Sequence, residues 1–227
     1  MKAISLQSLI DDGRLWKGGS SPEIAIRSSG FQALDQSLAG GGWPAHMLIE
    51  ILTSSPEELP MQCILKTWQL HQDERWYVLV NPPYQPCAEG LIQANLKPEQ
   101  IDLIRANPKD TSWCLEQMAG SPAIASILAW GIEKIRTPQL RRLQLACQQA
   151  RTQLFLIRPL NARANASPAP LRAQLHKIDS GFTIEIFKQP AANAHPIIEI
   201  KNDLEWLLKP APAMRKIVTQ SIHKRLQ

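Results

Sequence analysis

Three features that would place a chain in a special class are missing from this sequence: a long apolar run, closely spaced cysteines and a cluster of metal ligands. No apolar stretch approaches the roughly 20 residues that a membrane-spanning helix needs. The four cysteines have no C-x-x-C spacing and the five histidines are scattered, so we expect reduced thiols and no bound metal. The amino-terminal segment has early acidic residues and lacks the long apolar core of a signal peptide, so we expect a cytoplasmic protein.

Acidic residues are also missing from the last part of the chain, residues 209–227. Its five basic residues are Lys209, Arg215, Lys216, Lys224 and Arg225. This segment therefore holds the whole net charge of +5, while residues 1–208 balance 20 basic against 20 acidic side chains. Such a distribution excludes a uniformly basic nucleic-acid-binding domain.

Apolar runs alternate with amphipathic segments through most of the chain. The runs have the length and composition of strands that are buried on both faces of a parallel sheet. We expect strands at 47–52, 76–80, 101–105, 123–130 and 154–157, and helices at 30–38, 60–71, 86–94, 110–119 and 138–151. The alternation predicts an α/β fold with a mainly parallel central sheet flanked by helices.

The pattern divides the chain into three parts. Residues 1–27 are predicted to form an amino-terminal helix and linker, and residues 28–208 the α/β core. The core ends in a β extension, which consists of a hairpin at 171–177 and 182–188 and an edge strand at 197–201. Residues 209–227 form a basic amphipathic tail.

The segment from Ser28 to Leu52 resembles the lead-in to the core of RecA-type ATPases. The shared pattern consists of Ser29-Gly30, Leu34-Asp35, Gly40-Gly41-Gly42-Trp43-Pro44 and a strand that contains Glu50. One departure is His46, since RecA-like lead-ins often have glycine before the strand. This resemblance implies a RecA-like core.

The phosphate-binding loop that follows this lead-in in RecA-like proteins is missing. Residues 53–60 read Thr-Ser-Ser-Pro-Glu-Glu-Leu-Pro and contain neither glycine nor lysine. A phosphate cradle needs glycines that let successive backbone N–H groups turn inward, and a lysine for the β and γ oxygens. Prolines instead remove N–H donors, and Glu57 and Glu58 would repel a triphosphate.

Two further parts of the ATPase machinery are missing from their expected places. The strand at 76–80 is followed by Asn81-Pro82-Pro83, which offers no general base for the attacking water. The strand at 123–130 ends in Trp130-Gly131 rather than in the aspartate that holds Mg²⁺. We therefore expect that the chain does not hydrolyse ATP, and that it has neither catalytic residues nor a cofactor. An NTPase with an unusual loop remains the enzymatic alternative.

Further motifs resemble the ImuA-type proteins, RecA-like accessory factors of bacterial translesion mutagenesis. In addition to the lead-in, they are Leu15-Trp16-Lys17-Gly18, Asn81-Pro82-Pro83-Tyr84, Leu140-Arg141-Arg142-Leu143-Gln144-Leu145-Ala146 and Phe155-Leu156-x-Arg158-Pro159. The match covers roughly residues 13–190. The part from Leu48 to about Leu175 also resembles SulA, the SOS cell-division inhibitor, although SulA-like chains tend to lack the Gly-Gly-Gly-Trp-Pro turn.

These resemblances imply a non-enzymatic protein of the SOS response. An ImuA-type protein would bind ImuB, an inactive Y-family polymerase homologue, and would also engage RecA. A SulA-like protein would instead bind the tubulin-like GTPase FtsZ. Self-association and weak or indirect contact with nucleic acid stay open, and we expect no membrane partner.

The tail is the first candidate for the partner-binding site. Apolar residues at helical spacing would occupy a groove on another protein, and the basic residues would steer it toward acidic surfaces. The candidate residues are Met214, Arg215, Lys216, Ile217, Val218, Ile222 and Arg225, with Trp43 as a separate candidate. Packing of the tail on its own core, or on DNA, is the alternative.

A second candidate is the Pro/Ala/Asn-rich segment 158–170, which lies where recombinases present a DNA-binding loop. Arg158 and Arg163 would contact DNA there, or the segment is simply a solvated loop. Among the tryptophans, Trp16 and Trp113 are possible interface anchors and Trp43 is either an anchor or a core residue. We expect core packing for Trp68, Trp76 and Trp130.

Overall fold

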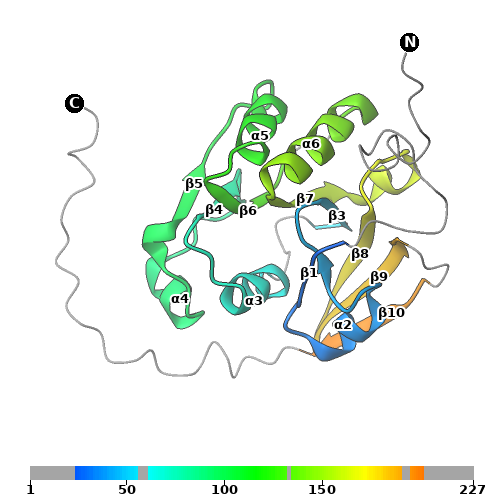
Figure 1. The fold of residues 1–227 in the computed structure, drawn as a ribbon. Coiled ribbons are helices and arrows are strands. Elements are labelled where there is room, and N and C mark those ends of the chain that lie inside the picture. The colour runs from blue at the N-terminus through cyan, green and yellow to red at the C-terminus, as the bar shows by residue number, and fades with distance from the viewer. Residues whose placement is uncertain (1–23, 56–60, 132–133, 191–194, 202–227) are drawn as a thin grey trace, which may run out of the picture.

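A computed structural model describes residues 24–55, 61–131, 134–190 and 195–201 (Figure 1). Its centre is an eight-stranded sheet, in which the strands lie in the order β10-β9-β8-β3-β7-β6-β4-β5. Six neighbouring strands run parallel, and β9 is antiparallel to both β8 and β10. The strands of this sheet are β3 (Leu48–Thr53), β4 (Trp76–Val80), β5 (Ile101–Ile104), β6 (Ile124–Ala129), β7 (Gln153–Pro159), β8 (Leu171–Ile178), β9 (Gly181–Lys188) and β10 (Ile197–Lys201).

Helices cover both faces of this sheet. They are α2 (Gln32–Ser37), α3 (Gln62–Leu70), α4 (Ala88–Gln93), α5 (Thr111–Ala119) and α6 (Thr137–Ala150), with short 3-10 turns η2 (Pro98–Gln100) and η3 (Leu160–Ala164). In Figure 1, α5 and α6 lie together on one side of the strands, and α3 and α4 lie on the other. Alternation of strand and crossover helix produces this two-sided arrangement.

The sheet separates two hydrophobic cores. One contains Leu34 of α2, Trp68 of α3 and Leu91 of α4, packed on the sheet and on the inner faces of β9 and β10. The other contains Leu115 of α5 and Leu140 of α6. All six residues of β3 are buried, because this strand lies in the middle of the sheet between β7 and β8.

Local sequence explains the boundaries of the longest helix, α6. Pro138 stands in the first turn, where its missing N–H is no loss, and the Gln139 side chain accepts a hydrogen bond from the backbone N–H of Arg136 at 2.9 Å. The helix ends at Arg151, whose φ of 56° is left-handed. Leu140, Leu143 and Cys147 are buried at helical spacing, as their sequence pattern predicts.

The structure confirms the predicted strands and their mainly parallel arrangement, and it also departs from the prediction in three places. An additional two-stranded sheet pairs β1 (Ile26–Arg27) with β2 (Trp43–Pro44). The segment predicted as a loop from residue 158 begins inside β7 and continues as η3. Trp76 stands at the amino end of β4 and is 42% exposed, so its assignment to the core was wrong. The predicted helix at residues 3–12 lies outside the described residues.

Candidate functional site

The carboxyl edge of the parallel strands is the first place to examine for a site. In open α/β sheets, ligands bind in the crevice outside this edge, because the loops that follow neighbouring strands meet there. Here the edge contains Thr53 at the end of β3, Asn81 after β4 and Trp130 after β6. Whatever these loops can do chemically depends on the side chains at those three positions.

Asn81 is committed to a structural role. Its φ of 50° is left-handed, and its backbone N–H donates to the carbonyl of Ile104 at 2.8 Å. Its amide oxygen accepts from the N–H of Ala106 at 2.8 Å, and its amide nitrogen donates to the hydroxyl of Thr111 at 3.3 Å. An amide has no proton-accepting function comparable to a carboxylate, so Asn81 ties β4 to β5 and α5 without supplying a general base.

Among the described residues, the ends of β3 and β6 provide no carboxylate at this edge either; Glu57, Glu58 and Glu133 lie outside them. Trp130 is buried, and its backbone N–H donates to the carbonyl of Val80 at 2.9 Å. After β3, the hydroxyl of Thr53 accepts a hydrogen bond from the N–H of Ser55 at 3.3 Å. The rest of that loop, residues 56–60, lies outside the described residues, but its sequence contains no lysine.

The strongest electrostatic feature lies one layer deeper, around the fully buried Glu50. Its two carboxylate oxygens accept from Nη1 of Arg158 at 2.7 Å and from Nε of Arg172 at 2.6 Å. Arg172 also donates to the carbonyls of Ala162 at 2.7 Å and Asn165 at 3.1 Å. The cluster therefore joins β3, β7 and β8 and holds η3 against the sheet.

This geometry corrects the prediction that Arg158 stands on an exposed, DNA-contacting loop. The residue is 1% exposed, and its guanidinium is bonded to Glu50, because the apolar strand β7 carries it into the interior. Arg163 is on the surface, but both of its terminal nitrogens donate to the carboxylate of Glu185 at 2.6 and 2.7 Å. The two arginines are therefore not presented together to a ligand.

Trp43 was a candidate partner contact, and the structure places it in the core. It is 0% exposed, and its ring meets the edge of Phe155 with the centroids 5.7 Å apart. Trp113 of α5 is 64% exposed and thus accessible, as expected for an interface anchor. Trp16 and the tail candidates Met214, Arg215, Lys216, Ile217, Val218, Ile222 and Arg225 lie outside the described residues.

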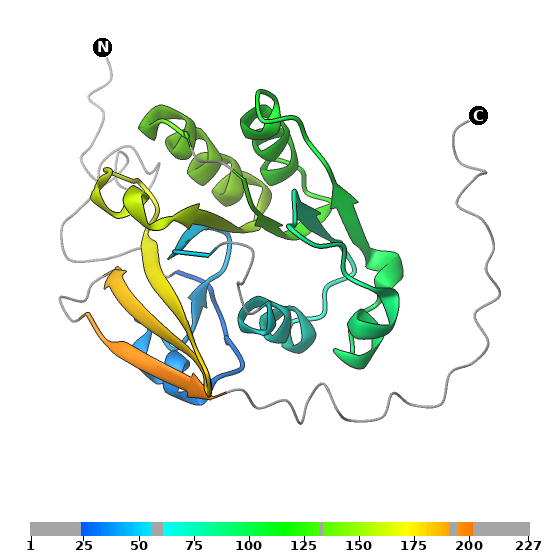
Figure 2. The same cartoon turned by 180° about the vertical axis from the view of Figure 1, so that it is seen from behind.

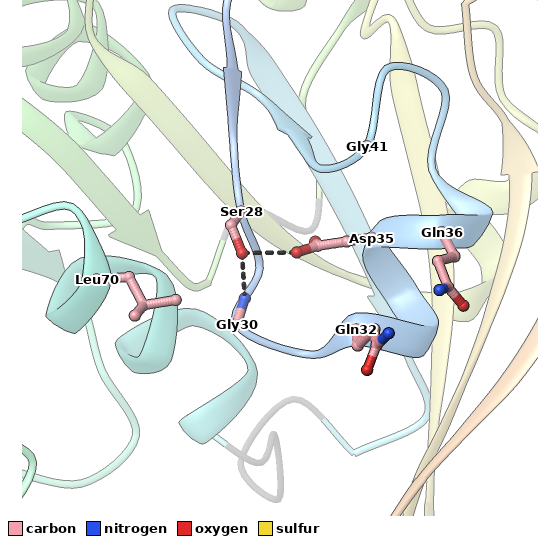
Figure 3. Close-up of a pocket in the computed structure, with 7 residues that line it drawn as sticks. All are labelled: Ser28, Gly30, Gln32, Asp35, Gln36, Gly41 and Leu70. Atoms are coloured by element: carbon pink, nitrogen blue, oxygen red, sulfur yellow. Dashed lines mark hydrogen bonds between the residues drawn. The ribbon is translucent and has the colours of Figure 1, made fainter.

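The Ser-Gly and Leu-Asp motif of the lead-in forms a surface pocket of about 460 Å³ (Figure 3). The Ser28 hydroxyl donates to one carboxylate oxygen of Asp35 at 2.6 Å, and the N–H of Ser29 donates to the other at 2.8 Å. Gly30 has a φ of 82°, and a Cβ there would lie 2.6 Å from Cγ of Lys66. These residues brace α2 against α3, so the motif has a packing role that the sequence alone did not reveal.

Neither a metal centre nor a membrane segment is present among the described residues. They contain no group of three or more His, Cys, Asp or Glu side chains placed to hold a metal ion. None of the helices in that part of the chain combines the length and the apolar composition that crossing a membrane requires.

Comparisons with known proteins identify the fold. No model of a known protein family matches the chain, and no curated protein matches it in sequence. Among solved structures, the chain is similar to the crystal structure of the RadB recombinase, with a TM-score of 0.58. The match has 15% sequence identity and covers 76% of this chain and 94% of that chain. The chain thus has the α/β fold of RecA-like recombinases, and an identity this low shows the fold alone.

Proposed function

We propose that the chain is a non-catalytic RecA-like accessory protein of SOS-induced translesion DNA synthesis. It acts by binding an inactive Y-family polymerase homologue of the ImuB type, RecA, or both. The observation that carries this proposal is a RecA-like sheet whose β4 and β6 are followed by Asn81 and Trp130 at the edge where ATPase chemistry would lie. The fold is kept without the groups that phosphoryl transfer needs.

The proposed absence of catalysis is supported by the composition of that edge. Phosphoryl transfer depends on cations and Mg²⁺ ligands that stabilise the charge of the transition state. The segment 53–60 contains no lysine and has two glutamates, and both functions of Asn81 are used within the fold. This arrangement supports a protein that works by contact and without a nucleotide cofactor, and we propose that it does so in the cytoplasm.

The choice of partner rests on the ImuA-type motifs, since similarity to RadB concerns the fold only. RadB is named a recombinase, but a strand-exchange activity is not part of our proposal. The ImuA-type motif around Leu140–Ala146 forms much of α6, and Phe155-Leu156-x-Arg158-Pro159 forms most of β7. Those motifs therefore contribute to the core scaffold, although Arg141, Arg142 and Leu145 of α6 are exposed.

We place the partner contact on the tail, residues 209–227. Its apolar residues repeat at helical spacing, and its five basic residues have no acidic neighbour in the segment. A groove with an acidic rim would accept such a segment, because apolar burial supplies affinity and opposite charge speeds association.

A SulA-like inhibitor of cell division that binds FtsZ is the second candidate. It is favoured by a specific observation: the stretch that resembles SulA, Leu48 to about Leu175, begins at β3 and ends within β8. This stretch contains all of the parallel strands and both α5 and α6, and so would be a nearly complete interaction scaffold. The Gly-Gly-Gly-Trp-Pro turn before β3 favours the first proposal.

An affinity pull-down from DNA-damaged cells tests both candidates. Three baits are compared: the full chain, a chain that ends at Lys209, and a full chain with Met214, Ile217 and Ile222 changed to serine. The serine variant keeps every basic residue, so it separates apolar docking from simple charge attraction. Recovery of the polymerase homologue or RecA by the full chain, with loss in both variants, is the expected result. Recovery of FtsZ instead would support the SulA-like function. If the full chain captured neither the polymerase homologue, nor RecA, nor FtsZ, both candidate functions would be contradicted.

A further inference from the structure

A second pocket lies on the β extension, on the face of β8 and β9 that also carries η3. It has a volume of about 400 Å³ and is lined by Arg163, Arg172, Glu185, Phe187, Lys188 and His195. In Figure 2, the strands of this extension are seen in yellow and orange, with the blue α2 behind them and no helix in front of them. The lining of this pocket contains none of Thr53, Asn81 and Trp130, the residues described above at the carboxyl edge.

Pairing of β8 with β9 brings like charges together in this pocket. Arg172 on β8 and Lys188 on β9 are direct partners in the register, next to an irregularity between Arg172 and Ala173. Like charges directly opposite one another in a sheet are destabilising unless something compensates them. The ring of Phe187 provides partial compensation, because the guanidinium carbons of Arg163 and Arg172 lie 4.6 and 5.0 Å from its centroid.

Most hydrogen-bond donors of the two arginines are already used. Arg172 bonds Glu50 and the carbonyls of η3, and Arg163 holds the carboxylate of Glu185. The ammonium of Lys188 donates one bond, to the carbonyl of Ser167 at 2.7 Å, which leaves two of its three protons for a ligand. Exposed His195 directs Nδ1 at the carbonyl of Ile186, 3.3 Å away, so Nδ1 carries a proton and Nε2 can donate to an anion when the ring is an imidazolium.

The charges around the pocket do not balance. Its surroundings contain the four cations Arg158, Arg163, Arg172 and Lys188 and the two carboxylates of Glu50 and Glu185. Arg163 pairs with Glu185, and Arg158 and Arg172 share Glu50. One excess positive charge therefore belongs to the buried Glu50 cluster, and the other belongs to Lys188. Burial and then the neighbouring charge of Arg172 lower the pKa of Lys188, while the charge of Glu50 opposes this shift.

We propose that this pocket binds the phosphate group of an anionic ligand, through the ammonium of Lys188 and the imidazolium form of His195. A phosphate, as a monoester or a diester, offers several oxygens to the donors that remain, and its negative charge offsets the positive charge of Lys188. The negative charge of Glu185 does not repel a bound phosphate strongly, because Arg163 neutralises it in a bidentate ion pair. This binding site is independent of the proposed contact with a protein partner.

Titration calorimetry with inorganic phosphate, on the full chain, tests the site. Saturable binding is expected, and Lys188→Gln should weaken it about tenfold or more, since it removes a charge-assisted hydrogen bond. Lys201→Gln is the matched control, because it removes one positive charge from β10 in the same β extension. Lys188→Arg keeps the charge and should retain most of the affinity.

Equal weakening in Lys188→Gln and Lys201→Gln would overturn the site in favour of diffuse attraction, and so would the absence of saturable binding. A circular dichroism spectrum confirms that each variant is folded. Oligothymidylate with and without a 5′-phosphate then identifies the source of the phosphate. Binding that requires the 5′-phosphate assigns the pocket to phosphate monoesters, and equal binding of both assigns it to the diester backbone of single-stranded nucleic acid.

Discussion

Nη1 of Arg158 donates to Oε1 of Glu50 at 2.7 Å, deep in the sheet, where both side chains are almost completely buried. The second carboxylate oxygen is taken by Arg172, which continues to the backbone of η3. A buried ionic cluster has a large desolvation cost, so it is weak support for overall stability. The cluster does have a clear effect on geometry: the bonds from Arg172 hold η3 against strands β7, β3 and β8.

Removal of the central carboxylate should be strongly destabilising. Glu50→Gln keeps the shape of the side chain but leaves two buried arginines without their counter-ion, which costs about 3–5 kcal/mol of unfolding free energy. Urea denaturation measures this difference. Glu185→Gln is the control, because it breaks the exposed pair with Arg163 and should cost less than about 1 kcal/mol. Equal losses in the two variants would show that the buried cluster is dispensable.

Mg-ATP should not stabilise the folded chain through a site at the carboxyl edge. Without a lysine in residues 53–60, a nucleotide would have no cation for its β and γ phosphates at the carboxyl edge of β3. Thermal unfolding in the presence of increasing Mg-ATP is the measurement. Because the pocket at Lys188 is proposed to bind phosphate, the titration is carried out with Lys188→Gln as well as with the unmodified chain.

A site at the carboxyl edge would be unmistakable in that experiment. Ligand at 100 times its dissociation constant adds about 2.7 kcal/mol to the unfolding free energy. A saturable shift of this size in Lys188→Gln would contradict the non-catalytic proposal and reopen the possibility of an NTPase with an unusual loop.

The scaffold could be predicted from the sequence because its signals are local. Strand β4 is a run of five apolar residues, and its observed bounds, Trp76–Val80, are those that the sequence predicts. The helix α6 has Leu140, Leu143 and Cys147 at the spacing of one helical face. In both cases, neighbouring residues alone contain the periodicity that burial imposes.

The electrostatic sites could not be predicted, since their partners are distant in sequence. Arg158 precedes a proline and begins a stretch rich in Pro, Ala and Asn, which is typical of a loop, yet its counter-ion is Glu50, more than 100 residues earlier. The pocket at Lys188 depends on the register of β9 with β8 and on the irregularity beside Arg172. Trp43, in a glycine-rich turn, is buried only because β7 brings Phe155 beneath it.

Stability should fall as the solution is acidified, because two histidines are held in their neutral form. Burial lowers the pKa of His46 and of His71 below the ordinary value of 6.5, and the charge of Arg27 adds to this effect at both sites. The unfolded chain then binds more protons than the folded chain. The unfolding free energy is therefore highest above about pH 6.5 and decreases from there toward the folded-state pKa values.

The variant His46→Asn should reduce this dependence on pH. Asparagine tolerates the left-handed φ of 37° at this position, and its amide can donate to the carbonyl of Arg151 that His46 contacts at 2.9 Å. Urea denaturation between about pH 5 and pH 7.5 measures the slope. His176→Asn, at an exposed position of β8, is the control for the loss of a surface histidine. If the unfolding free energy of His46→Asn changed with pH as steeply as that of the unmodified chain, the acid sensitivity would come from groups other than His46.

Two glycines in the lead-in separate the cost of backbone strain from the cost of overpacking. Both have a left-handed φ, 82° at Gly30 and 87° at Gly41, but only Gly30 faces a neighbour. Gly41→Ala should cost about 1–2 kcal/mol of unfolding free energy from strain alone. Gly30→Ala adds a contact of 2.6 Å with Cγ of Lys66 and should cost about 1–3 kcal/mol more.

A double-mutant cycle with Lys66→Ala tests the origin of that difference. Shortening Lys66 removes the atoms that the new Cβ would strike, so it should recover a substantial part of the loss in Gly30→Ala and none of the loss in Gly41→Ala. The single Lys66→Ala variant corrects for the contact of its ammonium with the ring of Phe31, 4.3 Å from the centroid. Additive effects of Gly30→Ala and Lys66→Ala would mean that α2 and α3 separate to make room. In that case, the Ser-Gly motif would not be what sets their distance.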